Sequence, residues 1–336
     1  HECRALFRLP PGLSPQAVKR RHGARNASLW QLIRRRKMPA LTVLICTHNR
    51  RALLEKVLAS IDAARHPSGW QIGIRVIANA CNDDTLDYLA ARSGARPLTF
   101  EHEMRPGKSH ALNRALSTLD GDVVAFVDDD HRVDAGYLEA VCQTFQSEPD
   151  IDLLCGRILP DWDGSEPAWV HEQGRYRVYP LPVPRFDLGD EPKTLGRGTA
   201  IPGGGNLAVR TGWLERIGMF SIELGPQGHD LGGAEDIDWI LRGLSQGARL
   251  VYRPQMTQYH YVDGARLQTS YVVRKAFHRS SSSARVDRIK PAAYMIRKCI
   301  MCMGSVALSL DSARRRHYLV RFAAALGELH GALKNR

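Results

Sequence analysis

Apolar residues between positions 40 and 130 alternate between two kinds of segment. Continuous apolar runs predict strands at 41–46, 72–78, 98–101 and 122–127. Apolar positions three or four residues apart predict helices at 51–64, 84–92 and 108–119. Strands that alternate with helices in this way form βαβ units, so we expect an α/β fold with a mostly parallel sheet.

The second half of the chain is patterned less regularly. Residues 159–200 are rich in proline, tryptophan and glycine, which predicts an irregular insertion. Short strands are predicted at 207–209 and 250–252, with a helix over 237–246. From Arg266 onward we expect helices that are basic on one side and apolar on the other.

Charge divides the 336 residues into three parts, although the whole chain carries +12. Residues 1–38 carry a balance of +9, residues 39–264 a balance of −9 and residues 265–336 a balance of +12. We therefore expect a basic N-terminal arm, a globular domain and a basic helical C-terminal region. Nucleic-acid-binding proteins place positive charge on their functional surface, so the acidic centre argues against nucleic acid as a partner.

The basic C-terminal helices suit an anionic membrane surface, on which a stretch such as Tyr318–Leu326 would lie. The alternative is an accessory helix that packs on the rest of the chain. Seven scattered cysteines suit free thiols in a reducing compartment. Neither a signal peptide nor a membrane span is predicted, so we expect a cytoplasmic protein, with at most peripheral contact to the inner face of the cell membrane.

Polar residues follow three of the predicted strands, at Thr47-His48-Asn49, Asn79–Asp84 and Asp128–Asp130. In parallel sheets ligands bind beyond the carboxyl ends of the strands, so we expect these turns to converge on one site. The three adjacent aspartates repel one another, and a divalent cation would offset that repulsion. Mg²⁺ and Mn²⁺ prefer carboxylate oxygens and keep positions open for substrate phosphates. A solvated turn that caps a helix is the alternative.

Two later motifs also carry ionisable groups. Glu235-Asp236 follows Gly232 and Gly233 at the start of a predicted helix, where one carboxylate acts as a general base or simply caps the helix. His260 lies between two tyrosines and is either a metal ligand or a core residue.

Two glycine-containing turns complete the set. Arg105–Lys108, followed by Asn113, either cradles phosphates or is a solvated basic turn. Gly203–Asn206 either lets the backbone approach a ligand closely or is a flexible turn. Neither turn fits a Walker loop or a dinucleotide-binding pattern, so we do not expect NAD.

In order and spacing, these motifs resemble those of family-2 glycosyltransferases with the A-type (GT-A) fold. The matching segments are Cys46–Arg50, Ala78–Thr85, Pro106–Leu116, Phe126–Asp130, Gly203–Asn206, Gly232–Asp236 and His260. The resemblance implies a Rossmann-like, mostly parallel central sheet flanked by helices, with a helical basic C-terminal extension. It also implies that residues 39–130 bind the nucleotide sugar and that residues 131–264 form the acceptor and catalytic half.

The resemblance assigns roles residue by residue. It implies that the nucleotide site contains Thr47, Asn49, Asn79, Asp83, Arg105, Lys108, Asn113, Asp128 and Asp129. It implies a metal site of Asp128, Asp130 and His260, and an acceptor site formed by Gly204, Gly205 and Asn206. Asp236 would be the general base, with Glu235 shaping the acceptor site. Many members have an aspartate where this chain has Ala78, so base recognition would pass to Asn79 or Asp83.

The expected function is therefore a metal-dependent, inverting sugar transfer with Mn²⁺ or Mg²⁺. The donor would be a UDP-sugar by default, with GDP and dTDP as alternatives. The acceptor would be a glycan, a lipid-linked sugar or a small molecule of the cell envelope or of natural-product synthesis. A sugar nucleotidyltransferase and a non-catalytic glycan-binding protein are the competing interpretations, although the intact carboxylate motifs argue against the second.

Overall fold

The computed structural model describes residues 38–179, 181–224, 235–286 and 291–334. Residues 40–336 form one compact unit. The basic arm predicted over residues 1–38 lies outside the described residues except for Met38.

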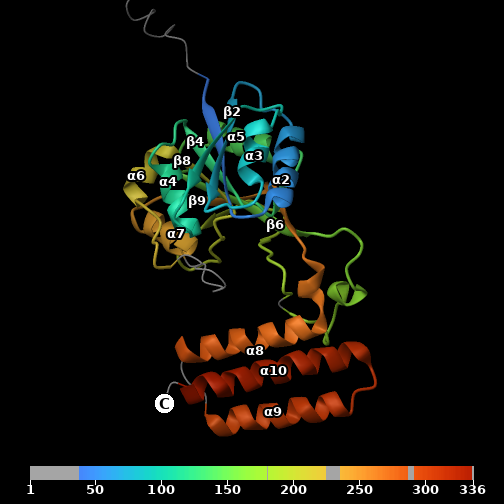
Figure 1. Ribbon diagram of the computed structural model, residues 1–336. Helices are drawn as coiled ribbons and strands as arrows, with labels where there is room; N and C mark the ends of the chain where they lie inside the picture. Colours follow the sequence, from blue (N-terminus) through green and yellow to red (C-terminus); the bar gives the residue numbers. More distant parts are fainter. Residues whose placement is uncertain (1–37, 180, 225–234, 287–290, 335–336) are drawn as a thin grey trace, which may run out of the picture. The chain divides into compact units, whose positions relative to one another are not determined.

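One nine-stranded sheet forms the centre of the described chain, in the order β3-β2-β1-β4-β8-β6-β9-β5, with β7 paired to β9 (Figure 1). Its strands are β1 (Ala40–Thr47), β2 (Gln71–Asn79), β3 (Leu98–Glu103), β4 (Val123–Val127), β5 (His131–Val133), β6 (Leu153–Asp161), β7 (Lys193–Leu195), β8 (Asn206–Arg210) and β9 (Leu250–Tyr261). Strands β3, β2, β1 and β4 are parallel, as are β6 and β9, whereas β8 runs antiparallel to both of its neighbours. The predicted α/β fold with a mostly parallel central sheet is confirmed.

Helices connect the strands and continue beyond them. They are α2 (Arg51–Ala63), α3 (Thr85–Ala91), α4 (Lys108–Leu116), α5 (Tyr137–Ser147), α6 (Leu214–Ile217), α7 (Glu235–Ser245), α8 (Thr269–Val286), α9 (Ala292–Ala307) and α10 (Ser312–Lys334). Three short 3₁₀ helices are η1 (Ala168–His171), η2 (Thr211–Trp213) and η3 (Gly264–Leu267). The described part of residues 159–200 contains only the end of β6, η1 and β7, so the predicted irregular insertion is confirmed.

Two hydrophobic cores lie on opposite faces of the sheet. Helices α2, α3 and α5 cover one core, and α4, α6 and α7 cover the other. Strand β1 contributes to both, because successive side chains of a strand point to opposite faces. Leu41, Val43 and Ile45 join the first core, and Leu44 joins the second. This sandwich leaves the carboxyl ends of the parallel strands as an edge where polar side chains can gather.

Strand β9 is much longer than the predicted strand at 250–252 and is interrupted at Pro254. Gly156 of β6 pairs with Arg253, but the next residue, Arg157, pairs with Thr257. The extra residues between them bulge out, which accommodates a proline that cannot donate a ladder hydrogen bond. A Cβ on Gly156 would lie 1.7 Å from the Met256 carbonyl oxygen, so only glycine fits opposite the bulge.

The C-terminal region is helical, as expected. Helix α10 packs against both α8 and α9 and lies between them (Figure 1). A third cluster of buried apolar residues joins Trp169 and Val170 of η1 to Leu267 and Val272. None of the described helices is long and apolar enough to cross a membrane. Because β9 ends at Tyr261 and α8 begins at Thr269, we keep the boundary at residues 264 and 265 as a proposal.

Candidate active site

The predicted convergence of the strand-end turns is confirmed. A pocket of about 420 Å³ lies at the carboxyl edge of the sheet. Its lining consists of Cys46, Thr47, His48, Arg50, Asn79, Pro106, Gly107, Lys108, Asp128, Asp129 and Asp130. Three turns that are far apart in the sequence thus share one cavity with the start of α4.

The three adjacent aspartates point to different partners. Asp128 Oδ1 accepts a hydrogen bond from Lys108 Nζ at 2.6 Å. Arg50 Nη1 donates to Asp129 Oδ1 at 3.0 Å and to Asp130 Oδ2 at 3.2 Å. Lys108 and Arg50 therefore offset part of the repulsion among the three aspartates, which a bound cation was expected to relieve.

Burial and charge act in opposite directions on this cluster. Burial would raise the pKa of Asp128, but the Lys108 ammonium and the nearby histidines outweigh it and lower that pKa to about 2. Burial dominates for Asp129, whose pKa is raised even though Arg50 and the Thr47 hydroxyl, 2.8 Å away, favour its charged form. The pKa of Lys108 is raised, because attraction to Asp128 exceeds the effect of burial. The site thus keeps a charged lysine–aspartate pair.

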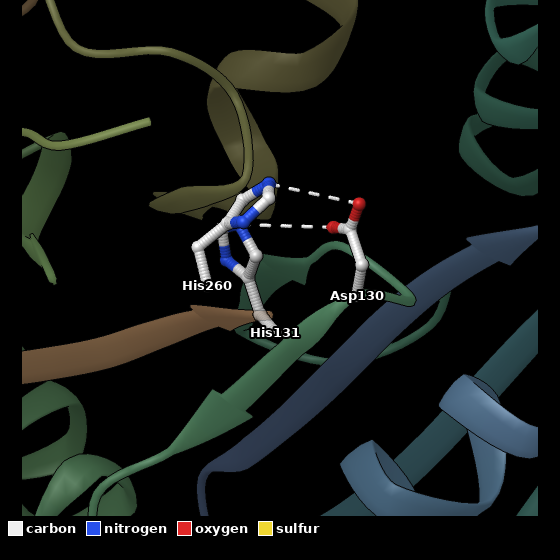
Figure 2. Close-up of side chains that lie close together, drawn as sticks. All are labelled: Asp130, His131 and His260. Atoms are coloured by element: carbon white, nitrogen blue, oxygen red, sulfur yellow. Dashed lines mark ion pairs between the residues drawn. The ribbon is translucent and has the colours of Figure 1, made fainter. Parts of the chain in front are cut away.

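Asp130 and two histidines form a second group. The antiparallel register of β5 and β9 pairs His131 directly with His260, and their rings lie 5.0 Å apart. Asp130 Oδ2 lies 3.6 Å from His260 Nε2, and Asp130 Oδ1 lies 3.9 Å from His131 Nε2 (Figure 2). One carboxylate oxygen and two imidazole nitrogens therefore lie within 4.8 Å of one another, a donor set that suits a divalent cation.

Hydrogen bonds at the Nδ1 atoms orient both rings. His131 Nδ1 lies 2.5 Å from Gln258 Oε1, and His260 Nδ1 lies 2.6 Å from the carbonyl oxygen of Tyr261. Both partners are acceptors, so each Nδ1 carries a hydrogen and each ring turns its Nε2 toward Asp130. Burial lowers the pKa of His260, which favours the neutral ring that a metal ligand requires. The residues present therefore fit a metal site.

Gln258 is held in turn by a buried hydrogen-bond network. Its Nε2 donates to the Tyr137 hydroxyl and to Asn206 Oδ1, each at 3.0 Å. Asn206 Nδ2 donates to the carbonyls of Arg157 and Met256, each at 2.9 Å. The fold thus uses the whole amide of Asn206, and its fully buried side chain has no donor left for an acceptor sugar.

The glycine loop predicted for the acceptor site lies between Asp128 and Asp236. The Gly204 N–H donates to Asp236 Oδ2 at 2.5 Å. A Cβ on Gly204 would lie 2.9 Å from Asp236 Cβ, and a Cβ on Gly205 would lie 2.3 Å from Asp128 Oδ2. The backbone reaches both carboxylates only because these positions lack side chains. Lys108, Asp128, Gly204 and Asp236 line one small cavity of about 20 Å³.

Glu235 and Asp236 are the first residues of α7, while Gly232 and Gly233 lie outside the described residues. Asp236 Oδ1 accepts a hydrogen bond from the Ile237 N–H at 2.7 Å. Glu235 is only 2% exposed, and burial raises its pKa. Its Oε2 has no hydrogen-bond partner in the part of the chain that the structure describes.

Four of the predicted nucleotide-site residues, Asn49, Asp83, Arg105 and Asn113, do not line the pocket described above and hold loops together instead. Asn49 Oδ1 accepts hydrogen bonds from the N–H groups of Asn82 and Asp83, at 2.8 and 3.3 Å. Asp83 Oδ1 accepts one from the Thr85 N–H at 3.2 Å, at the start of α3. Asn113 is bonded through its amide to the backbone of Phe220.

Asn79 and Arg105 shape the turn before α4. Asn79 lines the pocket, and its amide joins the Arg105 carbonyl at 2.7 Å to the Gly107 N–H at 2.8 Å. The Arg105 guanidinium donates twice to Glu103 at 2.9 Å, and this lowers the pKa of Glu103 to about 2 although burial opposes it. The turn is therefore held rigidly beside the pocket.

Ala78, where many family members have an aspartate, is fully buried in β2.

No role was predicted from the sequence for Arg50, His131 or Gln258. Arg50 could have been recognised from the sequence, because it is a cation directly after the Thr47-His48-Asn49 turn. The Asp128–Asp130 turn, expected at the same edge of the sheet, is acidic and could pair with it. Strand β5 is only three residues long, which is too short for a pattern to reveal the orientation of His131. Gln258 comes after Pro254, and a proline disfavours the interior of a strand, so the strand predicted at 250–252 was not extended to Gln258.

Known proteins resemble this chain over most of its length. Residues 39–289 match the family described as Glycosyltransferase like family 2. The glucosyl-dolichyl phosphate glucuronosyltransferase of Haloferax volcanii is 23% identical over 56% of this chain and 58% of its own. The pre-mycofactocin glycosyltransferase of Mycobacterium tuberculosis is 26% identical over 72% of this chain and 47% of its own. The chain thus spans about half the length of these relatives.

A solved structure has the same fold. The mannosyltransferase PcManGT from Pyrobaculum calidifontis, in complex with GDP-Man and Mn²⁺, is similar with a TM-score of 0.51 and 18% identity, covering 95% of this chain and 96% of that one. The GT-A architecture that the sequence predicted is therefore confirmed. Because the family match runs through every residue of the site described above, this chain belongs to glycosyltransferase-like family 2.

Proposed function

We propose that the protein transfers a sugar from a nucleotide-sugar donor to a hydroxyl group of an acceptor. One observation carries this proposal: Asp236 shares a cavity with Lys108 and Asp128, and these two residues also line the larger pocket at the strand ends. A donor bound in the larger pocket would have its diphosphate beside Lys108 and Arg50. Its sugar would then face the cavity that contains Asp236.

Asp236 is proposed as the general base. It takes the proton from the acceptor hydroxyl while that oxygen attacks the anomeric carbon from the face opposite the leaving nucleotide. No side chain acts as a nucleophile, so the anomeric configuration is inverted. The Gly204 N–H holds the Asp236 carboxylate at the start of α7, and Gly204, Gly205 and buried Glu235 shape the acceptor side.

Asp130, His131 and His260 are proposed to hold a divalent cation. Their mixed oxygen and nitrogen donors favour Mn²⁺ over Mg²⁺, which prefers oxygen ligands. A bound ion of this kind neutralises charge on the leaving nucleoside diphosphate. Asp128 was also expected to be a ligand; because its Oδ1 accepts from Lys108, we propose that it orients that lysine toward the donor.

The donor and acceptor classes follow from the sequence and the relatives. UDP-sugars remain the default donors, and GDP-mannose is the first alternative because the structurally similar mannosyltransferase binds it. One relative is named for glucosyl-dolichyl phosphate and the other for pre-mycofactocin. For this chain we propose a glycan, a lipid-linked sugar or a small molecule as the acceptor. We propose an anionic membrane surface as the partner of the basic C-terminal helices.

A panel of nucleotide sugars tests the proposal. With Mn²⁺, one of them is expected to raise the melting temperature of the protein, because a ligand that binds only the folded state stabilises it. That donor should then release nucleoside diphosphate, and NMR of the product should show an inverted anomeric centre. Release of pyrophosphate from a nucleoside triphosphate and a sugar phosphate would instead establish the nucleotidyltransferase. No shift with any donor would contradict both enzyme assignments.

A further inference from the structure

Helix α9 carries a row of large apolar side chains at the protein surface. This α9 apolar face consists of Tyr294, Ile296, Ile300, Met301 and Met303 of the helix and of Leu308 directly after it, which are between 47% and 82% exposed. Single exposed apolar residues are common on soluble proteins, but a contiguous group of them marks an interaction surface.

The spacing along α9 explains why both of its sides are apolar. Met295 and Cys302 are buried, and they lie two turns apart on the side of the helix that packs inward. Ile296, Ile300 and Met303 follow one another at intervals of four and three residues, so they form a second stripe on the exposed side. No described segment covers this second stripe.

The helices of the C-terminal region carry exposed positive charge, and part of it lies on α9. Exposed arginines on the three C-terminal helices are Arg274, Arg279, Arg297, Arg315 and Arg321. Arg297 is on α9 itself, one turn from Tyr294, Ile300 and Met301. Among the described residues of α8, α9 and α10, Glu328 is the one carboxylate, and it pairs with Lys298 at 3.2 Å.

We infer that the α9 apolar face lies on a bilayer that contains anionic lipids, with the helix parallel to the membrane surface. Exposed apolar side chains beside arginines match the acyl and headgroup layers of such a bilayer. A second copy of the chain fits less well, since pairing two α9 faces would bring two basic surfaces together. The described helices include no membrane span, so α9 binds at the surface.

This assignment moves the membrane contact away from the stretch predicted from the sequence. Within Tyr318–Leu326, Val320 packs on the cluster around Trp169, and Ala323 and Ala325 are buried. That stretch therefore belongs largely to the interior of the helical region. The inference rests on the membrane partner proposed above and names α9 as the element that makes the contact. Vesicle binding depends on no step of the proposed sugar transfer, so vesicle binding and sugar transfer can fail separately.

Flotation of the full chain with vesicles tests the inference. We expect the protein to float with vesicles of phosphatidylglycerol and phosphatidylcholine, and much less with phosphatidylcholine alone. The double variant Ile300→Ser/Met303→Ser should bind the anionic vesicles at least about tenfold more weakly. The matched control Met104→Ser/Met219→Ser removes side chains that are 73% and 54% exposed elsewhere, and it should bind like the wild type.

A charge variant provides a second readout. Arg297→Gln should weaken binding to the anionic vesicles, and so should added salt, because headgroup attraction is screened. The inference is overturned when the wild type does not float with anionic vesicles, or when Ile300→Ser/Met303→Ser floats as well as the wild type. A dimer that this variant dissociates, without any vesicle binding, would assign the face to a second copy instead.

Discussion

Gln258 connects the buried core to the proposed metal site, so replacing it should affect both stability and metal binding. Gln258→Met keeps the volume of the side chain but removes its polar atoms. The His131 Nδ1–H, the Tyr137 hydroxyl and Asn206 Oδ1 then lose their partner inside the protein. Each unsatisfied buried group costs about 1–3 kcal/mol, so the free energy of unfolding should fall by at least about 3 kcal/mol.

The same change should weaken metal binding. Without Gln258, nothing fixes the hydrogen on His131 Nδ1, so the ring no longer presents Nε2 reliably toward Asp130. Loss of such an outer partner typically lowers metal affinity by roughly 10–100-fold. Urea unfolding measures the first effect, and titration of Mn²⁺ followed by electron paramagnetic resonance measures the second, at a temperature where the variant is folded.

Thr257→Val is the matched control. Thr257 is the neighbouring residue and is also buried, but its hydroxyl donates to the Pro254 carbonyl at 2.6 Å. Its loss should cost about 1 kcal/mol and leave Mn²⁺ affinity intact. A folded Gln258→Met protein with wild-type Mn²⁺ affinity would refute the argument, and so would an equal loss of affinity in Thr257→Val.

Three further changes test the site. Asp236→Asn should lower kcat by on the order of 10²–10⁴-fold, while calorimetry shows that donor affinity is retained. The control Asp238→Asn, in the same helical turn, should keep its turnover. A normal kcat in Asp236→Asn would show that Asp236 is not the general base. Gly205→Ala places a methyl group 2.3 Å from an aspartate oxygen and should impair activity, whereas Gly203→Ala, with 3.4 Å of space, should be mild; equal activities would contradict this packing. Glu103 has a pKa lowered to about 2, so its contribution to stability is present above about pH 4.5 and is lost as the pH falls toward 2. The difference in melting temperature between the wild type and Glu103→Gln should therefore shrink over that range. A constant difference would show that the carboxylate is not held by its arginine.

Local patterns were sufficient for the first half of the sheet. The apolar runs of β1, β2 and β4 were visible in the sequence, and so were the polar turns that follow them. Parallel strands share one carboxyl edge, so the position of each strand end along the chain was enough to bring Thr47, Asn79 and Asp128 into one pocket. The glycines at 204 and 205 were recognised as positions of close approach, although what approaches them is the protein's own carboxylates.

Pairings between distant strands had to come from the tertiary structure. His131 faces His260 only through the register of β5 and β9. The inward direction of Asn206 depends on the same strands. A sequence shows which side chains are present. Contacts between strands depend on the register of the sheet, and the local pattern of apolar and polar residues carries no information about that register.

The sequence by itself determined that the C-terminal region is helical, basic and apolar. It could not show which apolar stripe is covered, because α9 has one on each side and both satisfy the same helical spacing. Only the packing of α10 against α9 decided that Met295 and Cys302 are buried while Ile300 and Met303 are exposed. Burial depends on which neighbour is present, and the identity of that neighbour is a property of the folded chain.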